Sequence, residues 1–166
     1  MLQVATRLLG LASVVWLVAG QPGRAGTIRH DRDDLLYTDL AALAEFEPVG
    51  MLKNNGELGL YSGTLVKPQW VLTAAHAVTN PTPTTGTFDV GGSQYTADQW
   101  IAHPQWTGVL GRGVDLALIH LTAPVSGITP ATLYTGSAEF NKAATIVGFG
   151  LTGTGLTGST PDSDGT

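Results

Sequence analysis

The chain of 166 residues contains no cysteine, and charged residues make up only 13% of it. Because no disulfide pattern is possible, cysteine usage says nothing about the compartment, and the core alone must hold the fold together. The eight lysines and arginines are scattered and the net charge is −5, which argues against a nucleic-acid partner. The histidines, at positions 30, 76, 103 and 120, show no metal-ligand spacing, so we predict neither a metal site nor a cofactor.

Apolar residues and glycine are plentiful. Hydrophobic residues account for 43% of the chain, which is enough to build a core, and there are 22 glycines. Many glycines with few charged residues favour short strands joined by tight turns over a helical bundle. The composition therefore points to an all-β protein.

The first segment has the pattern of a secretory signal peptide. Arg7 precedes an apolar run over residues 8–19, and small residues follow from Gly20 onward. The run is short for a membrane anchor, the alternative interpretation, because a spanning helix needs about 20 apolar residues. We predict a signal peptide over residues 1–25, with cleavage after Gly20 as an alternative, and a secreted protein, extracellular or periplasmic, without a membrane span.

Strand signals dominate after a polar N-terminal segment over residues 26–47. In this segment, Thr38 and Asp39 could cap a short helix through Leu40, Leu43 and Phe46. The expected strands cover residues 48–53, 57–66, 70–72, 87–90, 94–101, 114–121 and 144–149. Asn54-Asn55-Gly56 suits a hairpin turn, because an Asn-Gly step readily takes positive φ. Residues 150–166 are read as an open loop. Short strands without intervening helices indicate an antiparallel barrel or sandwich.

Two stretches carry chemistry. Residues 62–77 read SGTLVKPQWVLTAAHA, and residues 113–121 read GVDLALIHL. An aspartate such as Asp115 is costly to bury in an apolar strand unless it accepts hydrogen bonds, and the imidazole of His76 would supply one. Taken alone, His76 would more often be structural, and Asp115 could simply face water at the start of a strand.

Together these stretches resemble the chymotrypsin/trypsin family of serine proteases (peptidase S1). The first is similar to the family's Trp-Val-Leu-Thr-Ala-Ala-His signature, and the second to its Asp-Ile-Ala-Leu strand. The resemblance implies that His76 is the general base and that Asp115 orients it. His103-Pro104 is similar to a structural step of the family, residues 145–150 resemble the first strand of a second barrel, and His120 is assigned no role.

The chain departs from the family at the nucleophile. No Gly-Asp-Ser-Gly-Gly turn is present, and Ser163 lacks the flanking glycines and comes only 48 residues after Asp115. The specificity pocket, which the family builds from its second barrel, is missing as well. Tyr61 and Ala77 stand where the family has a cysteine pair, which suits a bacterial-type secreted member.

The sequence thus predicts a truncated all-β, chymotrypsin-like antiparallel barrel: a first barrel over residues 48–123, then a connector and the start of a second barrel over 124–166. The implied function is serine-type endopeptidase acting on proteins or peptides through an acyl-enzyme. Its serine would lie beyond Thr166, so the chain alone would be inactive. The alternative is a non-catalytic, protease-like binding or regulatory module, against which the presence of both His76 and Asp115 argues.

Overall fold

The computed structural model describes residues 28–54, 61–79, 83–150, 152–156 and 158–160. The predicted signal peptide and Ser163 lie outside these residues. Within them, no helix has the length and apolar character needed to span a membrane.

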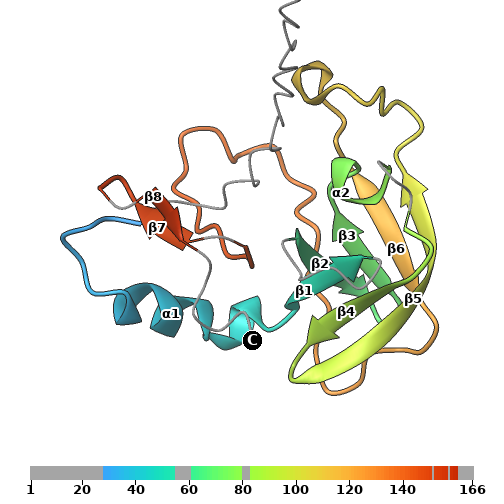
Figure 1. Cartoon of the computed structure of the whole chain (residues 1–166), viewed down its shortest axis with the longest axis horizontal. Coiled ribbons are helices and arrows are strands. Elements are labelled where there is room, and N and C mark those ends of the chain that lie inside the picture. The colour runs from blue at the N-terminus through green and yellow to red at the C-terminus, as the bar shows by residue number, and fades with distance from the viewer. Residues whose placement is uncertain (1–27, 55–60, 80–82, 151, 157, 161–166) are drawn as a thin grey trace, which may run out of the picture.

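Six strands form a closed antiparallel barrel (Figure 1). They are β1 (Val49–Asn54), β2 (Tyr61–Lys67), β3 (Trp70–Thr73), β4 (Gly86–Val90), β5 (Ser93–Ala102) and β6 (Ala117–Leu121). Their order around the barrel is β1-β2-β3-β6-β5-β4, and β4 closes the barrel by pairing with β1. The predicted all-β barrel is therefore confirmed.

The interior is filled because the strands alternate between inward and outward side chains. β1 and β4 show strict alternation of burial, as a period of two residues requires. The largest fully buried side chains are Phe88, Leu52, Leu65, Ile119, Leu121, Val71 and Val78. Gly50 and Gly63 face each other across β1 and β2, and both leave room for the ring of Phe88.

The last barrel strand is shorter than predicted. Residues 114–121 were expected as one strand, but β6 begins only at Ala117. Gly113 and Val114 both have positive φ, 75° and 58°, and the Leu116 N–H bonds back to the Val114 carbonyl at 2.9 Å. A backbone turned in this way cannot continue a ladder, so Asp115 lies just before the strand and not within it.

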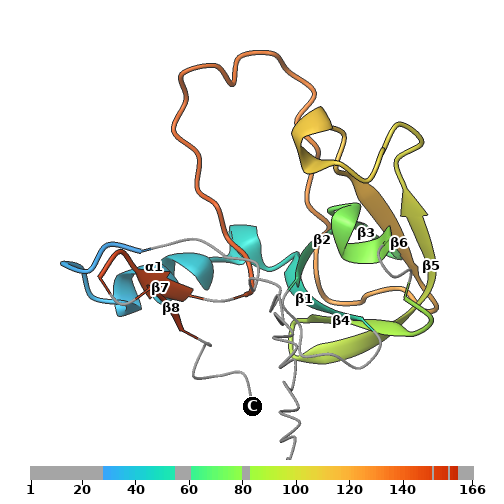
Figure 2. The same ribbon diagram turned by 45° about the horizontal axis from the view of Figure 1, so that its top comes forward.

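The predicted strand over residues 144–149 is wrong. Residues 131–149 run as an extended arm away from the barrel (Figure 2) and are described as loop throughout. Ile146 is 96% exposed. The apolar pattern of residues 144–149 is suitable for a strand, but the backbone of this segment forms no ladder with the backbone of any described strand.

The predicted open loop at the C-terminal end is also wrong. β7 (Thr152–Thr154) and β8 (Gly158–Thr160) form a small hairpin, and Ile28 adds a parallel bridge to Thr154. Gly158 has a φ of 69°, which the turn into β8 uses. The Gly- and Thr-rich sequence resembles a loop in composition, although threonine fits a strand well.

The N-terminal helix begins earlier than predicted. α1 covers Leu35–Ala41, and a separate 3₁₀-helix, η1, covers Ala44–Phe46. The Asp33 carboxylate accepts the Leu35 N–H at 3.0 Å, which starts α1, and extended backbone at Leu43 divides the two helices. Both views place α1 beside the β7–β8 hairpin and away from the barrel (Figures 1 and 2).

Candidate catalytic histidine–aspartate pair

His76 is presented by a short helix seated on one end of the barrel. The chain leaves β3 and turns directly into α2 (His76–Thr79). Ala75, Ala77 and Val78 are buried against the barrel core, and such small side chains let α2 sit close to it. His76 points the other way, with 48% of its side chain exposed. The sequence around His76 therefore provides the buried side chains that hold α2 on the barrel and an imidazole that is exposed to solvent.

Asp115 meets His76 because β3 and β6 are neighbours. Thr73 at the end of β3 pairs with Ala117 at the start of β6, so the residues just beyond these two ends converge. Asp115 Oδ2 lies 2.7 Å from His76 Nδ1, and Asp115 Oδ1 accepts the backbone N–H of His76 at 2.8 Å. The structure thus brings together the two predicted site residues, and the carboxylate holds both the ring and the backbone of His76.

The environment keeps Asp115 ionised. Burial acts to raise the pKa of this carboxyl, but hydrogen bonds from the His76 ring and backbone N–H, together with the Ala75 N–H, outweigh it. The pKa of Asp115 therefore lies below its ordinary value. An ionised carboxylate only accepts hydrogen bonds, so His76 Nδ1 must carry the proton and donate it. In the neutral imidazole, Nε2 of His76 is then the acceptor, which is the form that a general base requires.

The family model for trypsin matches residues 43–163, most of the chain. This chain belongs to the trypsin family. No curated protein sequence matches it. Among solved structures it is similar to neuropsin, a serine protease expressed in the limbic system of mouse brain, with 23% identity and a TM-score of 0.45. The match covers 54% of this chain and 44% of neuropsin, so the chain spans less than half the length of that protease.

This trypsin-family chain holds its histidine helix without cysteine. Tyr61 places its ring edge-on to the His76 ring, with 6.3 Å between centroids. The Asn54 side chain donates to the Ala77 carbonyl at 2.6 Å, and the Trp106 indole N–H lies 3.2 Å from Thr79 Oγ1. Neither contact could be predicted from the sequence, because Asn54 has the pattern of a turn residue and the Trp106 side chain comes from a loop.

The other histidines of the barrel lie elsewhere. His103 Nδ1 accepts the Gln105 N–H at 3.2 Å in the loop after β5. His120 was assigned no role. Its Nδ1 lies 2.7 Å from Asp98 Oδ1, and its ring meets the Trp70 ring at 4.8 Å. This second His–Asp pair joins the neighbouring strands β3, β6 and β5, and its described hydrogen bond and ring contact both stay within these strands.

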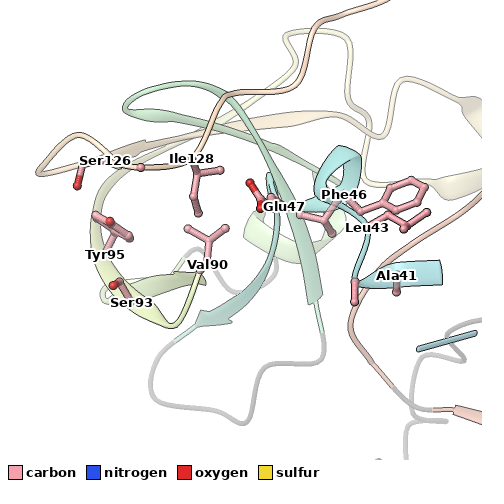
Figure 3. A pocket seen from close by; sticks show the side chains of 13 residues that line it. Ala41, Leu43, Phe46, Glu47, Val90, Ser93, Tyr95, Ser126 and Ile128 are labelled. Atoms are coloured by element: carbon pink, nitrogen blue, oxygen red, sulfur yellow. The ribbon is translucent and has the colours of Figure 1, made fainter. Parts of the chain in front are cut away.

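A cavity of about 490 Å³ is lined in part by residues of the β4–β5 turn (Figure 3). This turn lies at the opposite end of the barrel from α2 (Figure 1). The lining of the cavity includes Phe46, Val90 and Ile128, with Glu47 and Tyr95 as the ionisable groups. Neither His76 nor Asp115 contributes to it. The candidate chemistry of this family member is therefore on the open surface around His76 and separate from the cavity.

Proposed function

We propose that this chain supplies the general base and its orienting carboxylate to a secreted serine endopeptidase. One observation carries the proposal: a single carboxylate, Asp115, accepts hydrogen bonds from both the Nδ1 and the backbone N–H of His76. That arrangement fixes the tautomer and the orientation of the imidazole together. Membership of the trypsin family supports a peptide substrate.

In the proposed mechanism, His76 transfers the proton and Asp115 stabilises the charge that forms on His76. His76 Nε2 removes the proton from a serine hydroxyl as its oxygen attacks the peptide carbonyl, and His76 then gives that proton to the leaving amine. Asp115 stabilises the imidazolium that forms between these steps. The serine, the oxyanion hole and the specificity pocket come from sequence after Thr166. Secretion follows from the predicted signal peptide over residues 1–25.

The test begins with the coding sequence downstream of Thr166. An open frame reaching a Gly-Asp-Ser-Gly-Gly turn within roughly 100 residues is expected. The extended protein should hydrolyse peptide substrates and react with a fluorophosphonate at that serine. His76→Ala should lower kcat by several orders of magnitude, and Asp115→Asn by about 10⁴-fold.

The 166-residue chain alone is expected to show no peptidase activity. Turnover by this chain that His76→Ala abolishes would contradict the assignment of the serine to later sequence. A stop codon directly after Thr166, with the intact mass of the secreted product in agreement, would instead favour the non-catalytic binding module.

A further inference from the structure

Two of the last carbonyls of α2, those of Ala77 and Thr79, have no α-helical donor in the sequence. α2 is four residues long, and in a longer helix the Ala77 carbonyl would accept the N–H four positions later. That position is Pro81, which has no N–H, and Pro83 stands in the same relation to Thr79. Ala77 is also buried. A donor from another element therefore stabilises this carbonyl, because a buried carbonyl without a partner is costly.

Asn54 provides that donor. It is the last residue of β1, it is 5% exposed, and its Nδ2 lies 2.6 Å from the Ala77 carbonyl oxygen. Its Oδ1 is buried and accepts no hydrogen bond from the described residues. Burying a polar amide is unfavourable without compensation. The bond to Ala77 is thus the compensating interaction for a buried amide at this position.

The two contacts on α2 come from different sides of the barrel. Asp115 reaches His76 from the turn just before β6, whereas Asn54 reaches the adjacent residue, Ala77, from the end of β1. β2 and β3 lie between β1 and β6 in the barrel order. Two contacts on consecutive residues, made from separated strands, restrict rotation of α2 more than either contact alone.

We propose that Asn54 is a positioning residue for His76: through the Ala77 carbonyl it fixes α2 so that His76 keeps both bonds to Asp115. This inference rests on the proposed function, in which His76 is the general base. Asn54 itself touches no reacting atom. It acts by narrowing the range of orientations of the imidazole, and orientation is what makes a general base effective.

The test uses the proton signal of His76 Hδ1 in the full chain, recorded by NMR at low temperature. The signal is assigned by its loss in His76→Ala. Asn54→Leu keeps the size of the side chain and removes the donor. We expect exchange of His76 Hδ1 with water to become about tenfold faster, because the bond to Asp115 opens more often.

Gln69→Leu is the matched control. The Gln69 side-chain amide also donates to a backbone carbonyl, that of Leu121 at 3.0 Å, but it lies away from α2. We expect Gln69→Leu to lower the thermal stability and to leave the His76 Hδ1 exchange unchanged. An unchanged exchange rate in folded Asn54→Leu, or equal acceleration in both variants, would overturn the positioning role and leave the proposed function intact.

Two further outcomes are decided by the same spectra. The wild-type chain should show a His76 Hδ1 signal, and Asp115→Asn should remove it. If this signal is absent from the wild type, or persists in Asp115→Asn, the pair is not formed. The proposed function then fails together with this inference. If Asn54→Leu does not fold, the reverse measurement decides. Asp115→Asn should then shift the Asn54 side-chain NH₂ signals and not those of Gln69, and the absence of that shift would overturn the inference.

Discussion

At the scale of single residues, Asp115 is the group whose charge state matters most. Its carboxylate is held below its ordinary pKa by bonds that only the folded chain offers. The unfolded chain lacks these bonds, so its Asp115 takes up a proton at higher pH than the folded chain does. Asp115 therefore stabilises the fold fully above the unfolded pKa of about 3.9, and this contribution is lost as the pH falls through the lower folded pKa.

Replacing Asp115 should reduce the acid sensitivity of the fold. We expect the free energy of unfolding of Asp115→Asn to fall less steeply below about pH 4 than that of the wild type. Urea unfolding at a series of pH values measures this slope. Asp31→Asn, which removes the carboxylate of a solvent-exposed ion pair with Arg29, is the control and should change the slope little. Equal slopes for Asp115→Asn and the wild type would contradict the expectation.

The core leaves no room for a side chain at Gly63. A Cβ at Gly63 would lie 2.5 Å from Val71 Cγ1 and 3.1 Å from Phe88 Cε2, and both neighbours are fully buried. Gly63→Ala should therefore destabilise the barrel by about 1–3 kcal/mol through overpacking, measured by urea unfolding. Gly111→Ala, where a Cβ meets nothing within 4 Å, is the matched control. A loss equal to that of Gly111→Ala would refute the packing argument.

At the scale of elements, the arm over residues 131–149 is tied back to the barrel at its far end. Ser62 Oγ on β2 accepts the Phe149 N–H at 2.7 Å and donates to the Phe149 carbonyl at 3.0 Å. At the near end, the Ala131 N–H bonds to the Leu65 carbonyl at 2.8 Å, again on β2. β2 thus holds both ends of the arm, and the hydroxyl of Ser62 holds the far end.

Ser62→Ala should release the far end of the arm and leave the near end in place. The two lost bonds are partly solvent-exposed, so we expect a change of about 1 kcal/mol, or roughly fivefold faster hydrogen exchange at the Phe149 amide. The Ala131 amide, whose bond is made by the backbone, serves as the internal reference. Faster exchange at both amides would indicate a general loosening of β2, and no change at Phe149 would show that the hydroxyl is not the anchor.

Strands that bury one face against the core have an alternating apolar pattern, so they could be predicted from the sequence. Strands that bury no face lack this pattern and could not be predicted. The strands around Leu52, Leu65 and Val71 alternate clearly, and the structure confirms them. The strands of the β7–β8 hairpin contain only threonine, glycine and serine, and Leu156 between them is 77% exposed, so the sequence of the hairpin resembles a loop. His76 and Asp115 were found through their flanking motifs. Asn54 could not be found, because its role depends on a contact 23 residues away in the chain.

At the scale of the whole molecule, the structure divides into a closed barrel with a hydrophobic core and an arm that carries apolar side chains into solvent. The exposed large side chains of the arm are Leu133, Tyr134, Phe140, Ile146 and Phe149. A series of exposed apolar residues on one segment is typical of a surface that another protein surface covers. In the proposed protease, the sequence that supplies the serine would cover the arm.

The arm should therefore make the 166-residue chain self-associate. Phe140 and Ile146 are 84% and 96% exposed, and neither belongs to the core cluster. We expect the double variant Phe140→Ser with Ile146→Ser to lower the association constant, measured by sedimentation, at least several-fold. The binding of a hydrophobic dye should fall by a similar factor, because exposed apolar surface drives self-association and dye binding alike. The unfolding midpoint of the barrel should stay unchanged. Leu110→Ser, at an exposed leucine outside the arm, is the control and should alter neither property. A wild-type chain that stays monomeric and binds no dye would show that the arm folds its apolar side chains away in solution.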